Sequence, residues 1–240
     1  MRASSSDPMS LTDRLMEVRG RVAAAALSAG RDPASVSLIA VSKTFPLDAV
    51  RDAYAAGQRD FGENRVQEAL PKIAGSTDLD IRWHLLGHLQ TNKAQKAGPA
   101  FATIQSVDNL ELIEKIDRAA EATGRSPELL IQVDLAGEAA KFGAPTAEVP
   151  RLFEAAAACR AARVVGLMTL PPFPDSPEDS RPWFRQLRDL RAGWLASGVP
   201  PPMLREMSMG MSGDFEVAIQ EGATMVRVGT AIFESRRVDT

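Results

Sequence analysis

The regular alternation of short apolar runs with amphipathic stretches is the feature that most constrains the fold of this chain. Eight runs have the length and composition of buried strands, and most are followed by apolar residues at helical spacing. Strict alternation of strand and helix favours a parallel sheet, because each helix returns the chain to the same end of the sheet. The predicted strands are residues 36–43, 59–62, 82–87, 102–107, 128–135, 163–170, 204–210 and 224–233.

Eight such units predict an α/β protein in which the sheet closes into a single (β/α)8 TIM barrel. A barrel of this kind takes roughly 200 to 250 residues, and the chain has 240, of which 45% are hydrophobic. A doubly wound open sheet is the alternative, and it would need fewer strands or a second domain. Apolar spacing after residue 10, with Gly30 as a stop, adds an extra N-terminal helix. We read the Pro-rich interval 171–182 as a loop after the sixth strand.

Several predicted helices begin with residues that suit a helix start. Asn64 with Gln67, and Asp108 with Glu111, have the spacing of capping boxes. Asn64 could also face a site, because a residue at a strand-to-helix turn can cap with one group and present another to a cavity. The Ser-rich residues 1–10 are expected to be disordered.

Composition favours a small ligand over a macromolecular one. A net charge of −3 lacks the basic excess that nucleic-acid binding requires. No segment reaches the apolar length of a membrane span, and the N-terminus has no apolar core typical of a signal peptide. Cys159 has no second thiol to pair with, which suits a reducing compartment. We therefore expect a cytoplasmic protein that binds neither nucleic acid nor membranes.

Lys43 ends the first apolar run, where a cation is unexpected. In a barrel the ligand site forms at the carboxyl ends of the strands. Ile39, Val41 and Lys43 share one face of the first strand, so an inward face would bring the amine into the top of the cavity. We expect this amine to be poorly solvated, because desolvation lowers a lysine pKa and so favours attack on a carbonyl. The structural alternative is a lysine that reaches the rim or pairs with a buried carboxylate.

The loops after strands seven and eight predict an anion site. Arg227 and Gly229 share a face of strand eight, and the hydroxyl of Thr230 follows. Glycines let a backbone approach an anion closely, and these two loops are the usual phosphate-binding place in barrels. The loop after strand seven adds Ser208, Gly210, Ser212 and Gly213, with a helix predicted to start near Ser212.

A turn with an N-cap serine is the structural alternative for this loop. Asp214 and Glu216 would lie in the first helical turn, where their charges could repel a phosphate. Combined with a reactive lysine and an arginine facing the same cavity, however, a phosphate cradle suggests pyridoxal 5'-phosphate (PLP). Its aldehyde would form a Schiff base with Lys43, and Arg227 would face the pyridine nitrogen.

Seven blocks carry a family resemblance: "AVSKTFP", "GENRVQEA", "WHLLGHLQTNK", "QVDLAGEAAKFG", "GLMTL", "SMGMSGDFEVAI" and "VRVGTAIF". In this order, from about residue 36 onward, they resemble the YggS/PROSC family of pyridoxal phosphate homeostasis proteins, which share the barrel of alanine racemase. The resemblance implies that residues 11–240 form one PLP-binding barrel. It departs at Arg65, where many relatives have tyrosine. The resemblance implies that Lys43 forms the covalent aldimine. It implies that Ser208, Gly229 and Thr230 bind the phosphate, with Gly210 and Ser212 in the same phosphate-binding region. It also implies that Arg227 lies near the ring nitrogen and that Asn64 and His84 line the pocket.

The resemblance implies a carrier that holds and releases PLP without robust turnover, with PLP-dependent apoenzymes as possible recipients. An arginine beside the pyridine nitrogen disfavours its protonation and makes the ring a weaker electron sink. A racemase also needs a second acid/base group, and the only tyrosine, Tyr54, lies in a predicted helix where packing is its expected role. We expect a monomer.

Two other functions stay open. One is a fold-type III PLP enzyme acting on amino acids, with His84 or Lys141 as proton donor. The other is a cofactor-free lyase in which Lys43 attacks a phosphorylated keto substrate. A zinc site is not expected, because the His84 and His88 pair spans a strand end and a glycine, and no third ligand stands out.

Overall fold

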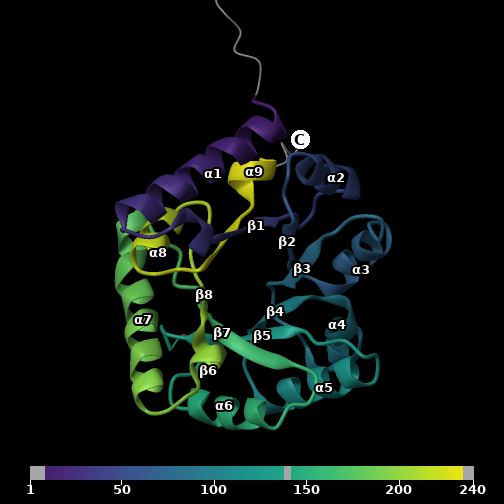
Figure 1. The fold of residues 1–240 in the computed structure, drawn as a ribbon, viewed down its shortest axis with the longest axis vertical. Coiled ribbons are helices and arrows are strands. Elements are labelled where there is room, and N and C mark those ends of the chain that lie inside the picture. The colour runs from purple at the N-terminus through teal and green to yellow at the C-terminus, as the bar shows by residue number, and fades with distance from the viewer. Residues whose placement is uncertain (1–8, 138–141, 235–240) are drawn as a thin grey trace, which may run out of the picture.

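The protein is a barrel of eight parallel strands surrounded by helices (Figure 1). The computed structural model describes residues 9–137 and 142–234. Seven of the eight predicted apolar runs contain one barrel strand each, and the remaining run, 59–62, overlaps a strand that extends one residue further, to Glu63. The barrel strands are β1 (Ser37–Val41), β2 (Asp60–Glu63), β3 (Arg82–Leu85), β4 (Thr103–Val107), β5 (Glu128–Asp134), β7 (Arg163–Met168), β8 (Glu206–Ser208) and β9 (Met225–Val228).

The sheet closes on itself. Its order is β4-β3-β2-β1-β9-β8-β7-β5, and a further pairing between β4 and β5 joins the two ends. The two-residue strand β6 (Ala144–Pro145) pairs with β5 outside this ring. Every pairing is parallel, so all carboxyl ends meet at one face of the barrel. The prediction of a (β/α)8 barrel is therefore confirmed.

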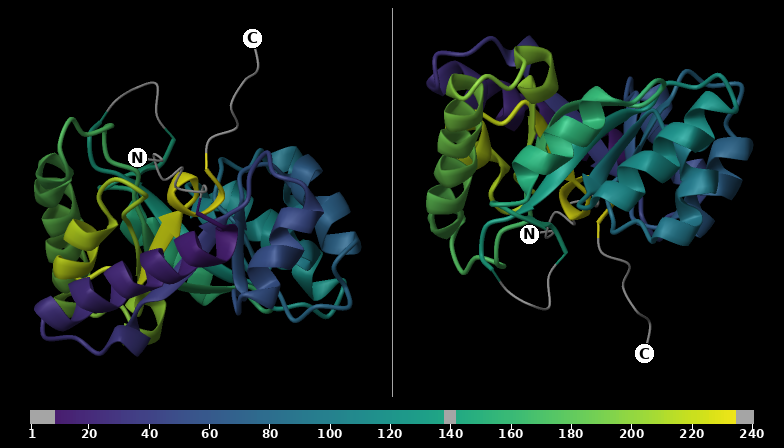
Figure 2. Two further views of the ribbon diagram at one scale, coloured as in Figure 1. Left: turned by 90° about the horizontal axis from the view of Figure 1, so that it is seen from above. Right: turned by 90° about the horizontal axis from the view of Figure 1, so that it is seen from below.

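Helices cover the outside of the sheet, as the views from above and below show (Figure 2). The extra N-terminal helix α1 packs against α8 and α9, which lie near the other end of the chain (Figure 1). Among the described residues, no helix has both the length and the apolar character that crossing a bilayer requires. The helices are α1 (Leu11–Ser28), α2 (Leu47–Ala55), α3 (Val66–Ala74), α4 (Ala94–Ala100), α5 (Leu110–Glu121), α6 (Val149–Ala157), α7 (Arg181–Ala196), α8 (Phe215–Gln220) and α9 (Thr230–Phe233).

Some predicted boundaries were wrong. The predicted last strand continued to residue 233, but Gly229 ends β9 and the following four residues form α9. Neither predicted capping box forms. Helix α3 starts after Arg65 without a side-chain cap, which leaves Asn64 outside the helix. Helix α5 is capped by Asn109, whose side chain accepts the Leu112 N–H, one residue later than predicted.

The barrel interior contains its own apolar cluster, separate from the larger core between sheet and helices. Ile39 and Val41 belong to this inner cluster, so the inward face of β1 is the predicted one. The other members are Leu86, Leu130, Val165, Met168 and Met225.

Candidate functional site

A cavity of about 940 Å³ opens at the carboxyl ends of β1, β2, β3, β7, β8 and β9. Loops from distant parts of the sequence meet here, because the parallel strands all end at this face. The cavity brings together six of the predicted site residues: Lys43, Asn64, Ser212, Arg227, Gly229 and Thr230. The other three, His84, Ser208 and Gly210, are outside its lining.

Lys43 lines the cavity from a turn that follows β1. The strand ends at Val41, so the lysine stands above the mouth and its side chain is exposed. The expectation of a poorly solvated amine was therefore wrong. The turn is strained, because Thr44 has a φ of 67°, in a region that β-branched residues rarely occupy.

A buried polar cluster supports this turn from the outer side of the sheet. Ser42 donates its hydroxyl to Glu63 Oε1 at 2.6 Å. Lys72, on α3, donates its amine to the same oxygen at 2.7 Å and to the Ser42 carbonyl at 2.9 Å. The Glu63 side chain is fully buried, and its Oε2 has no hydrogen-bond partner among the described residues. The cluster thus joins the residue before Lys43 to the residue before Asn64.

Asn64 reaches the cavity because the chain after β3 passes very close to it. A Cβ at Gly87 would lie 2.1 Å from the Asn64 carbonyl oxygen, so only glycine fits there. Gly87 also lines the cavity. This glycine was missed in the sequence, although its place directly after an apolar strand was an available signal.

The loops after β8 and β9 form the candidate anion site. Gly229 donates its N–H to Ser212 Oγ at 3.3 Å, which joins the two loops. The N–H groups of Thr230 and Ala231 start a helix, so they have no intrahelical acceptor. The carboxylate of Asp214, which also lines the cavity, accepts from Ser180 Oγ and from the Met211 N–H, at 2.7 Å each. Two carboxylates line the cavity, those of Asp175 and Asp214, and the Asp214 carboxylate is already paired with these two donors.

The helix after this loop starts later than predicted, and Gly210 has a packing role. Helix α8 begins at Phe215, with Asp214 as its N-cap residue, and Glu216 pairs with Arg21 of α1 at 2.7 Å. Gly210 has a φ of 91°, and a Cβ there would lie 2.5 Å from the Ala218 Cβ. Glycine at this position lets the loop pack against α8.

Arg227 lies at the cavity floor and is almost completely buried. It donates from Nη1 to Ser208 Oγ at 2.6 Å and from Nη2 to the Thr169 carbonyl at 3.0 Å. Burial lowers the pKa of Arg227 to about 10, against the opposing charge of Asp214. Arg227 is therefore still a cation at neutral pH. Ser208, fully buried, is held beneath it, so Ser212 is the serine that faces the cavity.

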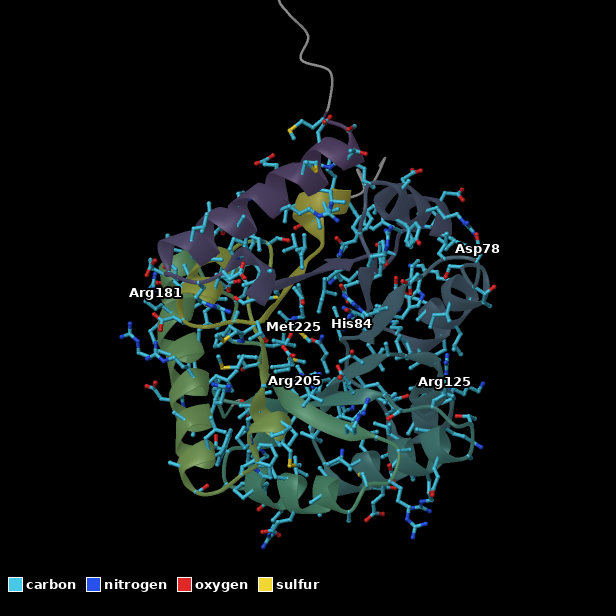
Figure 3. All side chains as sticks on the ribbon, viewed as in Figure 1. Asp78, His84, Arg125, Arg181, Arg205 and Met225 are labelled. Atoms are coloured by element: carbon cyan, nitrogen blue, oxygen red, sulfur yellow. The ribbon has the colours of Figure 1, made fainter. Side chains whose placement is uncertain are left out.

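His84 lies inside the barrel near Met225 rather than at the cavity wall (Figure 3). Its Nε2 is 2.9 Å from Asp60 Oδ1, and its Nδ1 is 3.2 Å from Gln105 Nε2. Burial alone would raise the pKa of Asp60, but hydrogen bonds from His84 and Arg82 outweigh it and lower that pKa to about 2. Asp60 and Gln105 were not identified in the sequence, because their proximity to His84 depends on strand register.

The other groups considered in the sequence do not add to the cavity. The Arg59 guanidinium lies over the Tyr54 ring, with its Cζ 3.8 Å from the ring centroid. Tyr54 therefore has the packing role that was expected. His88 stacks on Phe142 at 3.7 Å, away from His84. Across the described ranges there is no group of three His, Cys, Asp or Glu side chains that could hold a metal ion. Lys141 lies outside the described residues.

Comparison with known proteins shows the family of this chain. The family model for the N-terminal domain of alanine racemase matches residues 22–236. The pyridoxal phosphate homeostasis protein of Aquifex aeolicus is 41% identical over 230 residues, which cover 95% of this chain and 100% of that protein. This chain belongs to the pyridoxal phosphate homeostasis protein family.

Other members of the family support this assignment. The pyridoxal phosphate homeostasis protein of Pseudomonas aeruginosa is 42% identical over 226 residues, which cover 94% of this chain and 96% of that protein. The structure of PipY of Synechococcus elongatus PCC7942, with PLP bound, has 44% sequence identity and a TM-score of 0.80. The match covers 93% of this chain and all of PipY. The resemblance inferred from the seven sequence blocks is therefore confirmed.

Proposed function

We propose that this protein takes part in PLP homeostasis by holding PLP in the 940 Å³ cavity, covalently bound to the Lys43 amine, and releasing it. The observation that carries the proposal is the meeting of an amine, two loops with hydrogen-bond donors and a buried arginine in one cavity. PLP, when bound, supplies an aldehyde that combines with a primary amine and a phosphate that requires several hydrogen-bond donors.

The donors for the phosphate come from the loops after β8 and β9. Ser212 accepts from the Gly229 N–H, so its own hydroxyl proton is free to point into the cavity. The hydroxyl and N–H of Thr230 lie at the same wall. We therefore assign Ser212, Gly229 and Thr230 to the phosphate, and Ser208 and Gly210 to supporting this region from below.

Arg227 supports a carrier over a racemase-like enzyme. It can only donate hydrogen bonds, so it would meet the pyridine nitrogen as an acceptor and disfavour its protonation. His84, one of the two proposed proton donors, is buried away from the cavity. The exposed position of Lys43 also supports release, because water and competing amines can reach it.

The site assignment is tested by borohydride reduction of protein incubated with PLP, followed by peptide mass mapping. We expect one phosphopyridoxyl adduct, on the peptide that contains Lys43, and no adduct on that peptide in Lys43→Ala. An adduct on another lysine only would overturn the assignment. Absence of visible absorbance after incubation with PLP would favour the cofactor-free lyase.

The carrier role has its own test. The loaded protein, mixed with a PLP-dependent apoenzyme, is expected to restore the activity of that enzyme. Rapid exchange of the α-proton of an amino acid for deuterium by the loaded protein alone would instead indicate a PLP enzyme. The expected monomer is checked by light scattering in the same buffer.

A further inference from the structure

Five buried side chains form a hydrogen-bonded chain across the barrel, beneath the cavity. It runs from Arg227 on β9 to Ser208 on β8 and Gln105 on β4, at 2.6 Å for each step. It continues to His84 on β3 at 3.2 Å and to Asp60 on β2 at 2.9 Å. Barrel interiors are filled mainly by apolar side chains, and polar groups there are costly unless they are paired. A continuous polar chain at this depth therefore calls for a specific role.

The two ends of the chain fix its direction. Arg227 can only donate, so Ser208 Oγ accepts from it and gives its single proton to Gln105 Oε1. Asp60 is ionised and can only accept, so His84 carries a proton on Nε2. The side-chain amide of Gln105 lies between these fixed ends.

The hydrogen-bond directions at the two ends favour a neutral His84 in the middle of this hydrogen-bonded chain. A doubly protonated ring would donate from both nitrogens, and Gln105 would have to turn its oxygen toward His84 and its NH2 toward Ser208. The Ser208 oxygen would then face two donors, Arg227 and Gln105, and its proton would lose its acceptor in a fully buried place. With His84 neutral and protonated on Nε2, every group in the chain is satisfied.

We propose that Gln105 and His84 are positioning residues that act on the ligand of the cavity through Arg227. The chain turns the Ser208 oxygen toward Arg227, and together with the Thr169 carbonyl it fixes the guanidinium plane. Asp60, at the far end, accepts the Nε2 proton of His84 and does not line the cavity. The remaining N–H groups of Arg227 are left for an acceptor in the cavity, such as the pyridine nitrogen of PLP. This last step rests on the proposed function.

The first test uses the cofactor-free protein. The protein contains two histidines. ¹⁵N NMR of the imidazole rings, with His88→Gln for assignment, therefore identifies the signals of His84. We expect a neutral ring with a protonated Nε2 and an unprotonated Nδ1 at neutral pH. In Gln105→Leu, the Nδ1 signal should move toward that of a nitrogen without a donor. A doubly protonated ring, or a proton on Nδ1, in the wild type would overturn the proposal.

The second test measures PLP affinity by absorbance titration. We expect about tenfold weaker binding for Gln105→Leu, because loss of the Ser208 acceptor loosens a charged hydrogen bond at Arg227. Gln132→Leu is the matched control, since Gln132 is a buried glutamine of β5 that donates to the Phe142 carbonyl instead. Its affinity should change by less than about twofold, as for interactions outside the chain.

Gln105→Glu keeps an acceptor for Ser208 and should restore affinity to within about threefold of the wild type. In that variant His84 should become protonated on both nitrogens, because the introduced carboxylate can only accept a hydrogen bond from the ring. Equal losses in Gln105→Leu and Gln132→Leu, or no restoration by glutamate, would overturn the positioning role. If Gln105→Leu does not fold, the glutamate variant and the NMR result decide. If the wild-type protein takes up no PLP, the proposed function is refuted. The NMR experiment would still test the arrangement of the hydrogen-bonded side chains.

Discussion

Gly229 donates its backbone N–H to Ser212 Oγ at 3.3 Å, across the loops that follow β8 and β9. This bond makes one surface from two loops that lie seventeen residues apart in the sequence. Since the serine oxygen already accepts, its proton remains available for an anion in the cavity. The pair therefore combines loop positioning with hydrogen-bond donation at the proposed phosphate site.

Ser212→Ala should weaken PLP binding by about tenfold, because it removes a hydroxyl donor to a charged group. Pyridoxal, which lacks the phosphate, should bind the variant and the wild type with similar affinity. Titrations with both ligands measure the difference. Ser126→Ala is a suitable control, because the Ser126 hydroxyl donates to the Ala161 carbonyl outside the cavity. Equal losses for PLP and pyridoxal would argue against a phosphate contact.

Gly210→Ala should lower the free energy of unfolding by about 2 to 4 kcal/mol, through strain at a positive φ and overpacking. The added Cβ would lie 2.5 Å from the Ala218 Cβ and 2.9 Å from the Phe215 Cα. Urea denaturation provides the measurement. Gly213→Ala is the matched control in the same loop, since a Cβ there meets no atom within 4 Å. Similar stabilities for the two variants would show that the loop repacks freely.

Hydrophobic periodicity predicted the barrel well, because each buried strand or helix is indicated by the pattern of many residues and does not depend on any single position. Single positions depended on where each strand ends. Lys43 was expected at the end of a strand, but β1 stops at Val41 and the amine is exposed. Ser208 and Ser212 could not be distinguished in the sequence, since only the position of Arg227 shows which hydroxyl is covered. Asp60 and Gln105 join His84 through register alone.

Glu63 and Lys72 were missed for a related reason. A glutamate in a short strand and a lysine on a helix each look like ordinary surface residues in the sequence. Packing of α3 on the outer side of the sheet brings them to 2.7 Å and buries the carboxylate completely. The pair therefore depends on a helix-to-sheet contact that periodicity does not specify.

Lys72→Met should destabilise the protein by about 3 to 5 kcal/mol, because it leaves the buried Glu63 carboxylate without a countercharge. Adding Glu63→Gln should recover a large part of this loss, since the neutral amide no longer needs a cation. Urea denaturation of both variants measures the effect. Lys115→Met removes an exposed pair with Glu111 and should change stability by less than about 0.5 kcal/mol. Additive losses in the double variant would contradict a charge-pairing role.

Asp60→Asn should make stability less dependent on pH at the acidic end. The pKa of Asp60 is lowered to about 2 in the folded protein, from an ordinary value of 3.8, because hydrogen bonds from His84 and Arg82 outweigh burial. Because the pKa of Asp60 is lower in the folded than in the unfolded protein, the ionised side chain stabilises the folded state at pH values above about 4. This contribution is lost as the pH falls from about 4 toward about 2. The free energy of unfolding of the wild type should therefore exceed that of Asp60→Asn by about 2 kcal/mol at pH 7, and by less at pH 3.

Urea denaturation at the two pH values checks this, with Asp78→Asn as a control. Asp78 pairs with Arg51 at an exposed site, where solvent screens the charges, so its loss should have little effect at either pH. A difference between wild type and Asp60→Asn that stays constant from pH 7 to pH 3 would show that Asp60 acts through packing rather than through its charge.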